Sequence, residues 1–127
     1  MAQQYTKFVA ELKSALGAVL RSQRSAVQTE SGIHIAIAEA LMAMKREFKH
    51  EHRLNERDRL DFLVTPGIFI EAKKGAAGIA VLQQCGRYLD HPDTACAVIV
   101  AMRCDGQIPA TFREKPVFVI ELWRLVL

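Results

Sequence analysis

The sequence predicts a single α/β domain, because helical and strand periodicities alternate along a chain of 127 residues. Apolar residues recur at helical spacing in three segments, and a central block alternates between apolar and polar residues. A continuous apolar run near the C-terminal end is typical of a strand that is covered on both faces. The expected order is therefore helix, helix, three strands, helix, strand, strand.

Three segments are expected to be helical. The first is an amphipathic helix appended to the domain within residues 1–28. The second has Thr29 as its N-cap and runs to about Lys45. The third covers residues 78–89 and ends at the breaker sequence Asp90-His91-Pro92-Asp93.

Five segments are expected to be strands. The first three follow the second helix with no helix between them, which predicts a meander. The predicted strands span residues 49–54, 60–64, 68–72, 95–102 and 117–122.

The composition excludes several classes of protein. No apolar run reaches the roughly 18 residues of a membrane span, and the N-terminal sequence lacks the layout of a secretory signal, so we expect a cytoplasmic protein without membrane contact. The net charge of +3 permits a polyanionic partner without requiring one. Cys85, Cys96 and Cys104 are widely spaced, so we expect buried thiols and neither a zinc site nor a disulfide.

The central hairpin brings two acids together. A three-residue loop, Thr65-Pro66-Gly67, pairs Val64 with Ile68, and this register sets Asp61 opposite Glu71. Carboxylates about 5 Å apart on neighbouring strands repel one another and destabilise the sheet. A cation is therefore expected between them.

Two kinds of cation are candidates at this pair. A divalent metal ion would take the hard carboxylate oxygens as ligands. Alternatively, Arg59 and Lys73, which share the same face of the hairpin, would neutralise the acids as an ordinary ion-pair network.

The order Asp61, then Glu71-Ala72-Lys73, on adjacent strands resembles the PD-(D/E)XK nuclease superfamily, which has the restriction-endonuclease-like fold. Leu60 stands where the motif has its proline. The similarity covers about residues 29–102, and it leaves the N-terminal helix and a C-terminal extension, residues 103–127, without a counterpart. The matching elements are Glu30, Arg59-Leu60-Asp61-Phe62-Leu63-Val64, Ile70-Glu71-Ala72-Lys73 and Gln84-Cys85-Gly86-Arg87-Tyr88.

This resemblance implies a metal site. Asp61, Glu71 and the backbone carbonyl of Ala72 would bind Mg²⁺ or Mn²⁺, and the ion would polarise a phosphodiester and present a water molecule. Lys73 would orient or deprotonate that water. Gln84 would orient the cluster or the phosphate.

Glu30 is the candidate for a further metal ligand, either in a second site or to a metal-bound water. Its alternative role is that of a first-turn acid favoured by the helix dipole. His34, one turn later, is a candidate for the same cleft or a structural histidine. If Glu51 faces the cleft, alternation turns His50 and His52 away from it. These two histidines share a strand face and could bind a metal, but they lack a third clear ligand, so we expect both at the surface.

The implied function is hydrolysis of DNA phosphodiester bonds in repair, recombination or restriction, on duplex or branched DNA. Holliday-junction resolvases, restriction enzymes and viral or mobile-element repair nucleases are enzymes of this kind. The apolar C-terminal residues 117–127 and the first helix predict a homodimer. The competing hypothesis is a non-catalytic module that binds nucleic acid or protein. The basic residues expected to contact phosphates are Arg53, Arg57, Arg59, Lys74, Arg87 and Arg103.

Overall fold

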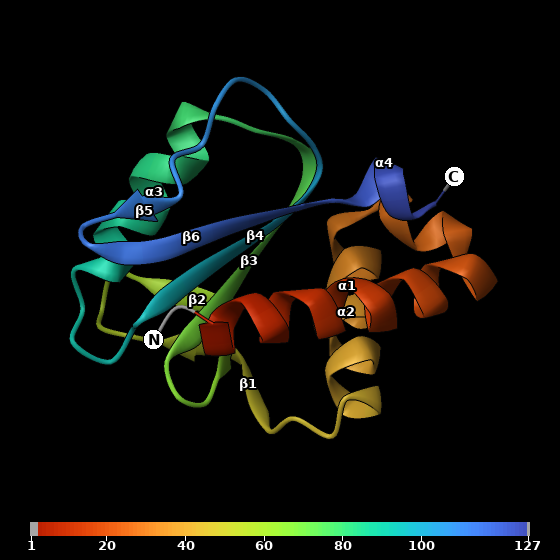
Figure 1. Cartoon of the computed structure of the whole chain (residues 1–127), viewed down its shortest axis with the longest axis horizontal. Helices are drawn as coiled ribbons and strands as arrows, with labels where there is room; N and C mark the ends of the chain where they lie inside the picture. The colour runs from red at the N-terminus through yellow and green to blue at the C-terminus, as the bar shows by residue number, and fades with distance from the viewer. Residues whose placement is uncertain (1–2, 127) are drawn as a thin grey trace.

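The mixed α/β architecture predicted from the sequence is confirmed. A computed structural model describes residues 3–126 of the chain (Figure 1). Its elements are α1 (Gln3–Ser22), the 3₁₀ helix η1 (Arg24–Gln28), α2 (Glu30–Ala43), β1 (Phe48–Arg53), β2 (Arg59–Val64), β3 (Ile68–Ala77), α3 (Ile79–Leu89), β4 (Cys96–Cys104), β5 (Thr111–Phe112), β6 (Lys115–Glu121) and α4 (Leu122–Leu125).

The strands lie in the spatial order β1-β2-β3-β4-β6-β5. The first three form the predicted antiparallel meander, β4 runs parallel to β3, and β6 runs parallel to β4. Helices α1, α2 and α4 lie on one side of the sheet, and α3 lies on the other (Figure 1).

Both faces of the sheet carry an apolar core. Phe62 and Ile70 belong to the core beneath α1 and α2, whereas Phe69 belongs to the core beneath α3. Along β4, Val98 and Val100 join the first core, and Ala97, Ile99 and Ala101 join the second. This alternation explains the continuous apolar run, because a strand buried on both faces has no position for a polar side chain.

The predicted cap of α2 is confirmed. The Thr29 hydroxyl oxygen accepts a hydrogen bond from the Gly32 N–H at 2.8 Å. The helix ends at Ala43, slightly before the predicted Lys45. Lys45 adopts a left-handed backbone with φ 57°, which cannot continue a right-handed helix.

Four features were absent from the prediction. The 3₁₀ helix η1 lies in the polar stretch after α1, α4 follows β6, and β3 continues to Ala77 past an irregularity between Lys73 and Ala76. The fourth is β5, in the segment predicted to be a loop. It packs on α3 at Gly86, where an added Cβ would collide with the ring of Phe112.

The predicted burial of the cysteines is correct for two of the three. Cys85 and Cys96 are buried, and burial raises the pKa of Cys96 to about 12. Cys104, the last residue of β4, is partly exposed, so the prediction of burial was wrong there. Within residues 3–126, no helix combines the length and the apolar character needed to cross a membrane.

Candidate metal centre

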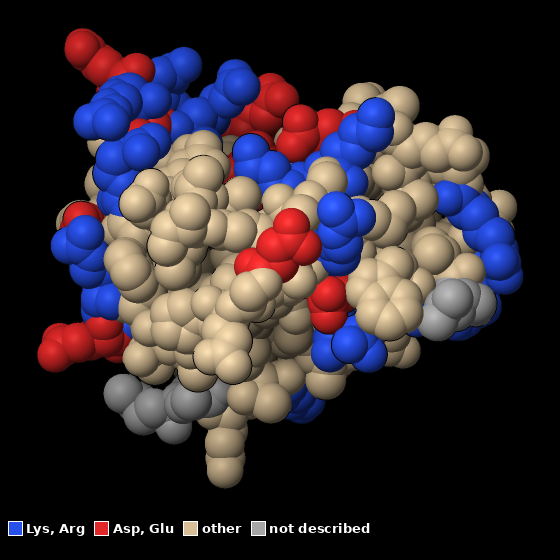
Figure 2. Space-filling model, turned by 90° about the horizontal axis from the view of Figure 1, so that it is seen from above, with Lys and Arg blue, Asp and Glu red and all other residues tan. Residues whose placement is uncertain are grey.

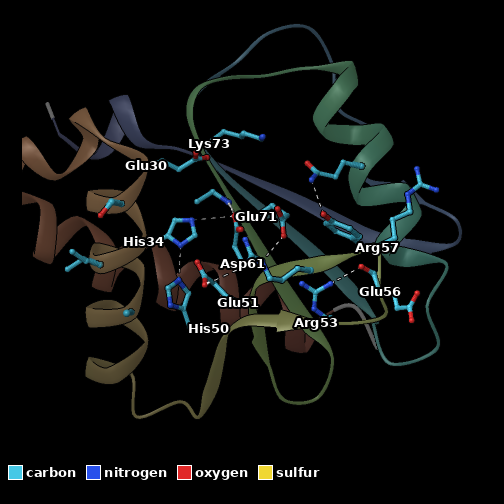
Figure 3. A pocket seen from close by; sticks show the side chains of 17 residues that line it. Glu30, His34, His50, Glu51, Arg53, Glu56, Arg57, Asp61, Glu71 and Lys73 are labelled. Carbon is cyan, nitrogen blue, oxygen red and sulfur yellow. Dashed lines mark hydrogen bonds and ion pairs between the residues drawn. The ribbon is translucent and has the colours of Figure 1, made fainter.

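A cleft of about 920 Å³ lies at the end of the meander opposite the β2–β3 turn, between α2 and α3 (Figure 3). In Figure 3, Glu30 and His34 come from α2 on one side, and Arg53, Glu56 and Arg57 lie on the other. The structure brings most of the predicted site residues together on the wall of this cleft: Glu30, Arg53, Arg57, Arg59, Asp61, Glu71, Ala72, Lys73 and Gln84.

The hairpin register is confirmed. Val64 pairs with Ile68 and Phe62 with Ile70, and the next residues along the two strands are Asp61 and Glu71. At these two residues, hydrogen bonds between backbone N–H groups and side-chain carboxylates replace the backbone-to-backbone bonds of the ladder. The Asp61 N–H donates to Glu71 Oε1 at 2.9 Å, and the N–H of the residue after Glu71 donates to Asp61 Oδ2 at 2.8 Å. The two bonds close a ring that fixes both carboxylates side by side.

Glu71 is buried and Asp61 is partly buried, and the pKa values of the two acids shift in opposite directions. Glu71 is only 3% exposed, and burial together with the charge of Asp61 raises its pKa to about 8. Burial also acts to raise the pKa of Asp61. Hydrogen bonds from His34 and from the Ala72 N–H outweigh that effect and hold the Asp61 pKa below its ordinary value. Without a bound cation, therefore, a proton on Glu71 relieves the repulsion at neutral pH.

The two basic residues proposed as neutralisers do not pair with these acids. Arg59 Nη1 lies 3.9 Å from Glu51 Oε2, so Arg59 is directed to a different carboxylate. Within the described chain, Lys73 forms no ion pair shorter than 4.0 Å, although its charge acts to lower the pKa of Glu71. The ammonium group of Lys73 is thus available to a ligand in the cleft.

These residues fit a divalent cation. Asp61 and Glu71 offer hard oxygen ligands from adjacent strands, and the carbonyl of Ala72 follows Glu71 along β3. The proton that Glu71 retains at neutral pH is what a cation would displace. Glu30 lines the same cleft from α2 and could add a further oxygen.

Two residues of α3 border the cleft on its second side. The Gln84 side-chain amide donates to the Tyr88 hydroxyl at 2.8 Å, and both residues are part of the wall. The Tyr88 ring packs edge-on against Phe69 in the core, and burial raises the pKa of its hydroxyl. Gln84 therefore reaches the cleft as predicted, with its amide fixed by a neighbour one turn away.

Three predicted phosphate contacts lie outside this wall. Lys74 and Arg103 do not line the cleft, and Arg103 pairs with Asp105. Arg87 binds the buried carboxylate of Asp58, with Nε 2.9 Å from Oδ1. Because Asp58 lies just before β2, this ion pair ties the β1–β2 loop to α3.

Sequence reasoning misplaced the side chain of His50. His50 is exposed, as predicted, but the prediction that it faces away from Glu51 was wrong, because both residues line the cleft. Glu51 has a left-handed backbone with φ 56°, which breaks the alternation of side chains along β1. His50 stacks on Phe62 and contacts His34. Only the run His50-Glu51-His52 of ligand-type residues could have signalled this in the sequence.

The surface charge is mixed. On the face in Figure 2, basic and acidic side chains interleave along the upper part and across the centre, and uncharged surface lies to either side of them. Because the net charge is only +3, the local arginines of the cleft matter more than any overall field.

No protein-family model, no curated protein and no solved structure matches this chain. The function of the chain is therefore inferred from the residues of the cleft.

Proposed function

We propose that this protein is a metal-dependent nuclease that hydrolyses DNA phosphodiester bonds and has the restriction-endonuclease-like core of the PD-(D/E)XK superfamily. The proposal depends on one observation. Two carboxylates on adjacent strands, Asp61 and Glu71, are locked side by side in a cleft that also contains Lys73 and a row of arginines.

The arrangement of elements supports this proposal. Helix α2, the antiparallel meander β1–β3, helix α3 and strand β4 parallel to β3 follow one another in the order that the superfamily resemblance implies. In that order the acid pair falls at the centre of the sheet, where rigid neighbouring strands fix the ligand positions.

Each residue of the cleft has a role that its position allows. When bound, the metal ion polarises the phosphodiester and lowers the pKa of a coordinated water. Asp61, Glu71 and the Ala72 carbonyl hold the ion. Lys73, two residues along β3 from Glu71 and free of ion pairs within the described chain, orients or deprotonates the attacking water and stabilises charge on the phosphate.

DNA is bound through its backbone. Arg53, Arg57 and Arg59 line one flank of the cleft and supply cationic donors to phosphate oxygens. Arg53 already donates to the carbonyls of Asn55 and Glu56 at 3.4 and 2.8 Å, which holds the β1–β2 loop in shape. The flank is therefore partly preorganised before DNA arrives.

A cleavage assay tests the proposal. Wild type, Lys73→Ala and Lys74→Ala are incubated with linear duplex, single-stranded and four-way branched DNA in Mn²⁺, Mg²⁺ or EDTA. Lys74 is a matched control, because it neighbours Lys73 but does not line the cleft. We expect cleavage that requires metal, falls by roughly 10²- to 10⁴-fold in Lys73→Ala, and persists in Lys74→Ala. Equal cleavage by Lys73→Ala and wild type contradicts the proposal.

A second candidate is a non-catalytic module that binds nucleic acid or protein on the same fold. The specific observation in its favour is that the ring of backbone hydrogen bonds satisfies Asp61 and Glu71 without an ion. If wild type retards DNA in a gel but cleaves none in any metal, this candidate replaces the nuclease.

The homodimer is also a proposal. Trp123 of α4 is 38% exposed and α4 packs against α1, so we propose that a second copy binds at this part of the surface. Analytical ultracentrifugation is expected to show a dimer, and a monomer at high concentration would contradict this.

A further inference from the structure

A second cluster of ligand-type side chains lies beside the acid pair. His34 of α2 and His50 and Glu51 of β1 each bring one ligand atom within 4.8 Å of the other two. The closest contact, at 2.8 Å, joins His34 Nδ1 and His50 Nε2. These atoms are grouped closely enough for one ion to contact all three.

The backbone of β1 creates the cluster. Successive side chains on a strand normally point to opposite faces, so His50 and Glu51 should not share a site. The left-handed φ of 56° at Glu51 sends both into the cleft. A left-handed non-glycine residue within a strand is conformationally costly, and such strain concentrates at functional sites.

The Phe62 ring contacts both imidazole rings, of which His34 is partly buried and His50 is exposed. His50 stacks on the buried Phe62 ring, with centroids 4.6 Å apart, and the His34 ring lies 5.4 Å from the same ring. Rings held in this way lose little further conformational freedom when they bind an ion.

The second nitrogen of His34 has the partner that a metal-bound histidine requires. Nε2 lies 3.5 Å from Asp61 Oδ2, on the side of the ring away from His50. Histidine ligands almost always direct their other nitrogen to a carboxylate or carbonyl, which selects the tautomer. A proton on Nε2 leaves the lone pair of Nδ1 directed at His50, at the centre of the cluster.

From this geometry we propose that His34, His50 and Glu51 form a binding site for a transition-metal ion of the Zn²⁺ type, distinct from the oxygen site of Asp61 and Glu71. Two imidazole nitrogens and one carboxylate are a ligand set that Zn²⁺ accepts, and the fourth tetrahedral position is left for water or a substrate oxygen. Mg²⁺ is excluded by its preference for oxygen ligands. Arg59 contacts Glu51 only at 3.9 Å, so the ion can replace that interaction.

The two sites share Asp61. It would act as an oxygen ligand on one side and as the hydrogen-bond partner of His34 on the other. An ion on His34 and His50 would thereby hold the Asp61 carboxylate in position for the neighbouring site. Occupancy of the histidine site does not depend on the nuclease proposal, because none of its three ligands is Glu71 or Lys73.

A Co²⁺ titration tests this site. Co²⁺ substitutes for Zn²⁺ and gives ligand-field absorption that reports nitrogen ligation. The chelator-treated protein is titrated with Co²⁺ in excess Mg²⁺, which occupies oxygen sites. We expect one Co²⁺ per chain, and we expect binding at least about 100-fold weaker in His50→Gln and Glu51→Gln, because even an outer partner of a ligand contributes 10- to 100-fold.

Two control variants make the result specific. His52→Gln replaces a histidine of the same strand that lies outside the cluster and the cleft wall, and it is expected to bind Co²⁺ as the wild type does. Glu71→Gln disables the proposed nuclease site but should also keep Co²⁺. Loss in Glu71→Gln with retention in His50→Gln would instead assign the ion to the acid pair and overturn this proposal.

Folding is checked on the same samples by circular dichroism and thermal melting. A folded His50→Gln with wild-type Co²⁺ affinity, or a wild type that binds no Co²⁺ in the presence of Mg²⁺, overturns the site. Loss of binding in both folded His50→Gln and folded Glu51→Gln supports it.

Discussion

The two ends of the β2–β3 hairpin are held together differently. Beside the turn, Val64–Ile68 and Phe62–Ile70 form a regular ladder whose side chains are completely or almost completely buried. At the other end, Asp61 and Glu71 replace the ladder with side chain-to-backbone bonds and border a cleft. The turn end therefore supplies stability and register, and this register places the two acids together at the far end.

The largest expected effect is a loss of stability caused by a substitution in the ladder beside the turn. Phe62→Ala removes a buried ring from the main core and from beneath both histidines, and it should lower the free energy of unfolding by about 3–5 kcal/mol. Denaturant titration measures this. A loss below about 1 kcal/mol would mean that the turn end is not the stabilising half of the hairpin.

The next effect is a pH dependence of stability, which arises from the acid pair at the far end of the hairpin. Because the folded-state pKa of Glu71 is raised from 4.5 to about 8, its stabilising contribution is complete below pH 4.5 and is lost as the pH rises to about 8. His34, whose pKa is raised from 6.5 by its bond to Asp61, adds a loss of the same sign above pH 6.5. In a chelator, the melting temperature of wild type should therefore fall across this range.

Glu71→Gln isolates the contribution of Glu71. The amide cannot ionise, so the variant should melt near wild type at pH 4.5 and above it at pH 8, with each pKa unit worth about 1.4 kcal/mol. Thermal melts in EDTA at several pH values measure this. Parallel curves for the two proteins would show that Glu71 titrates normally.

Metal binding gives a smaller effect, confined to the far end. At a Mn²⁺ concentration 100 times the dissociation constant, the wild type should gain about 2.7 kcal/mol of stability. Asp61→Asn should remove this gain, because the amide can still accept the Ala72 N–H but carries no charge. Thermal melts with and without Mn²⁺ report it, and an equal Mn²⁺ gain in Asp61→Asn would exclude Asp61 as a ligand.

The smallest expected effect concerns the arginines around the acid pair. Arg57→Ala should weaken DNA binding similarly for all sequences and reduce the slope of log affinity against log salt by about 1. Arg21→Ala, on α1 and outside the wall of the cleft, should change neither quantity. Fluorescence anisotropy at several salt concentrations distinguishes them, and identical slopes for Arg57→Ala and wild type would remove Arg57 from the interface.

Much of the fold followed from local patterns. The Thr29 cap, the three-residue loop of the hairpin and the apolar run of β4 each depend on neighbouring residues, and each is confirmed. The elements that were missed depend on tertiary contacts. Strand β5 is only two residues long and is positioned by the contact between Phe112 and Gly86, which no periodicity signals.

The candidate site also has one part that the sequence predicts and another part that depends on tertiary structure. The juxtaposition of Asp61 and Glu71 follows from strand register, which a sequence encodes through its turn. The position of His50 depends on a single left-handed residue, Glu51, and the pairing of Arg87 depends on a loop acid from β1–β2. A left-handed residue and a loop conformation do not change the hydrophobic periodicity of the sequence, so these two positions could not be predicted.

The most direct test of the central claim is the rate of duplex cleavage in Mn²⁺ at pH 8 for wild type and Glu71→Gln. The amide keeps an oxygen for the Asp61 N–H and removes only the charge that a metal ion needs. We expect metal-dependent cleavage by wild type and a loss of at least about 100-fold in a fully folded variant. Cleavage by Glu71→Gln at the wild-type rate would contradict it.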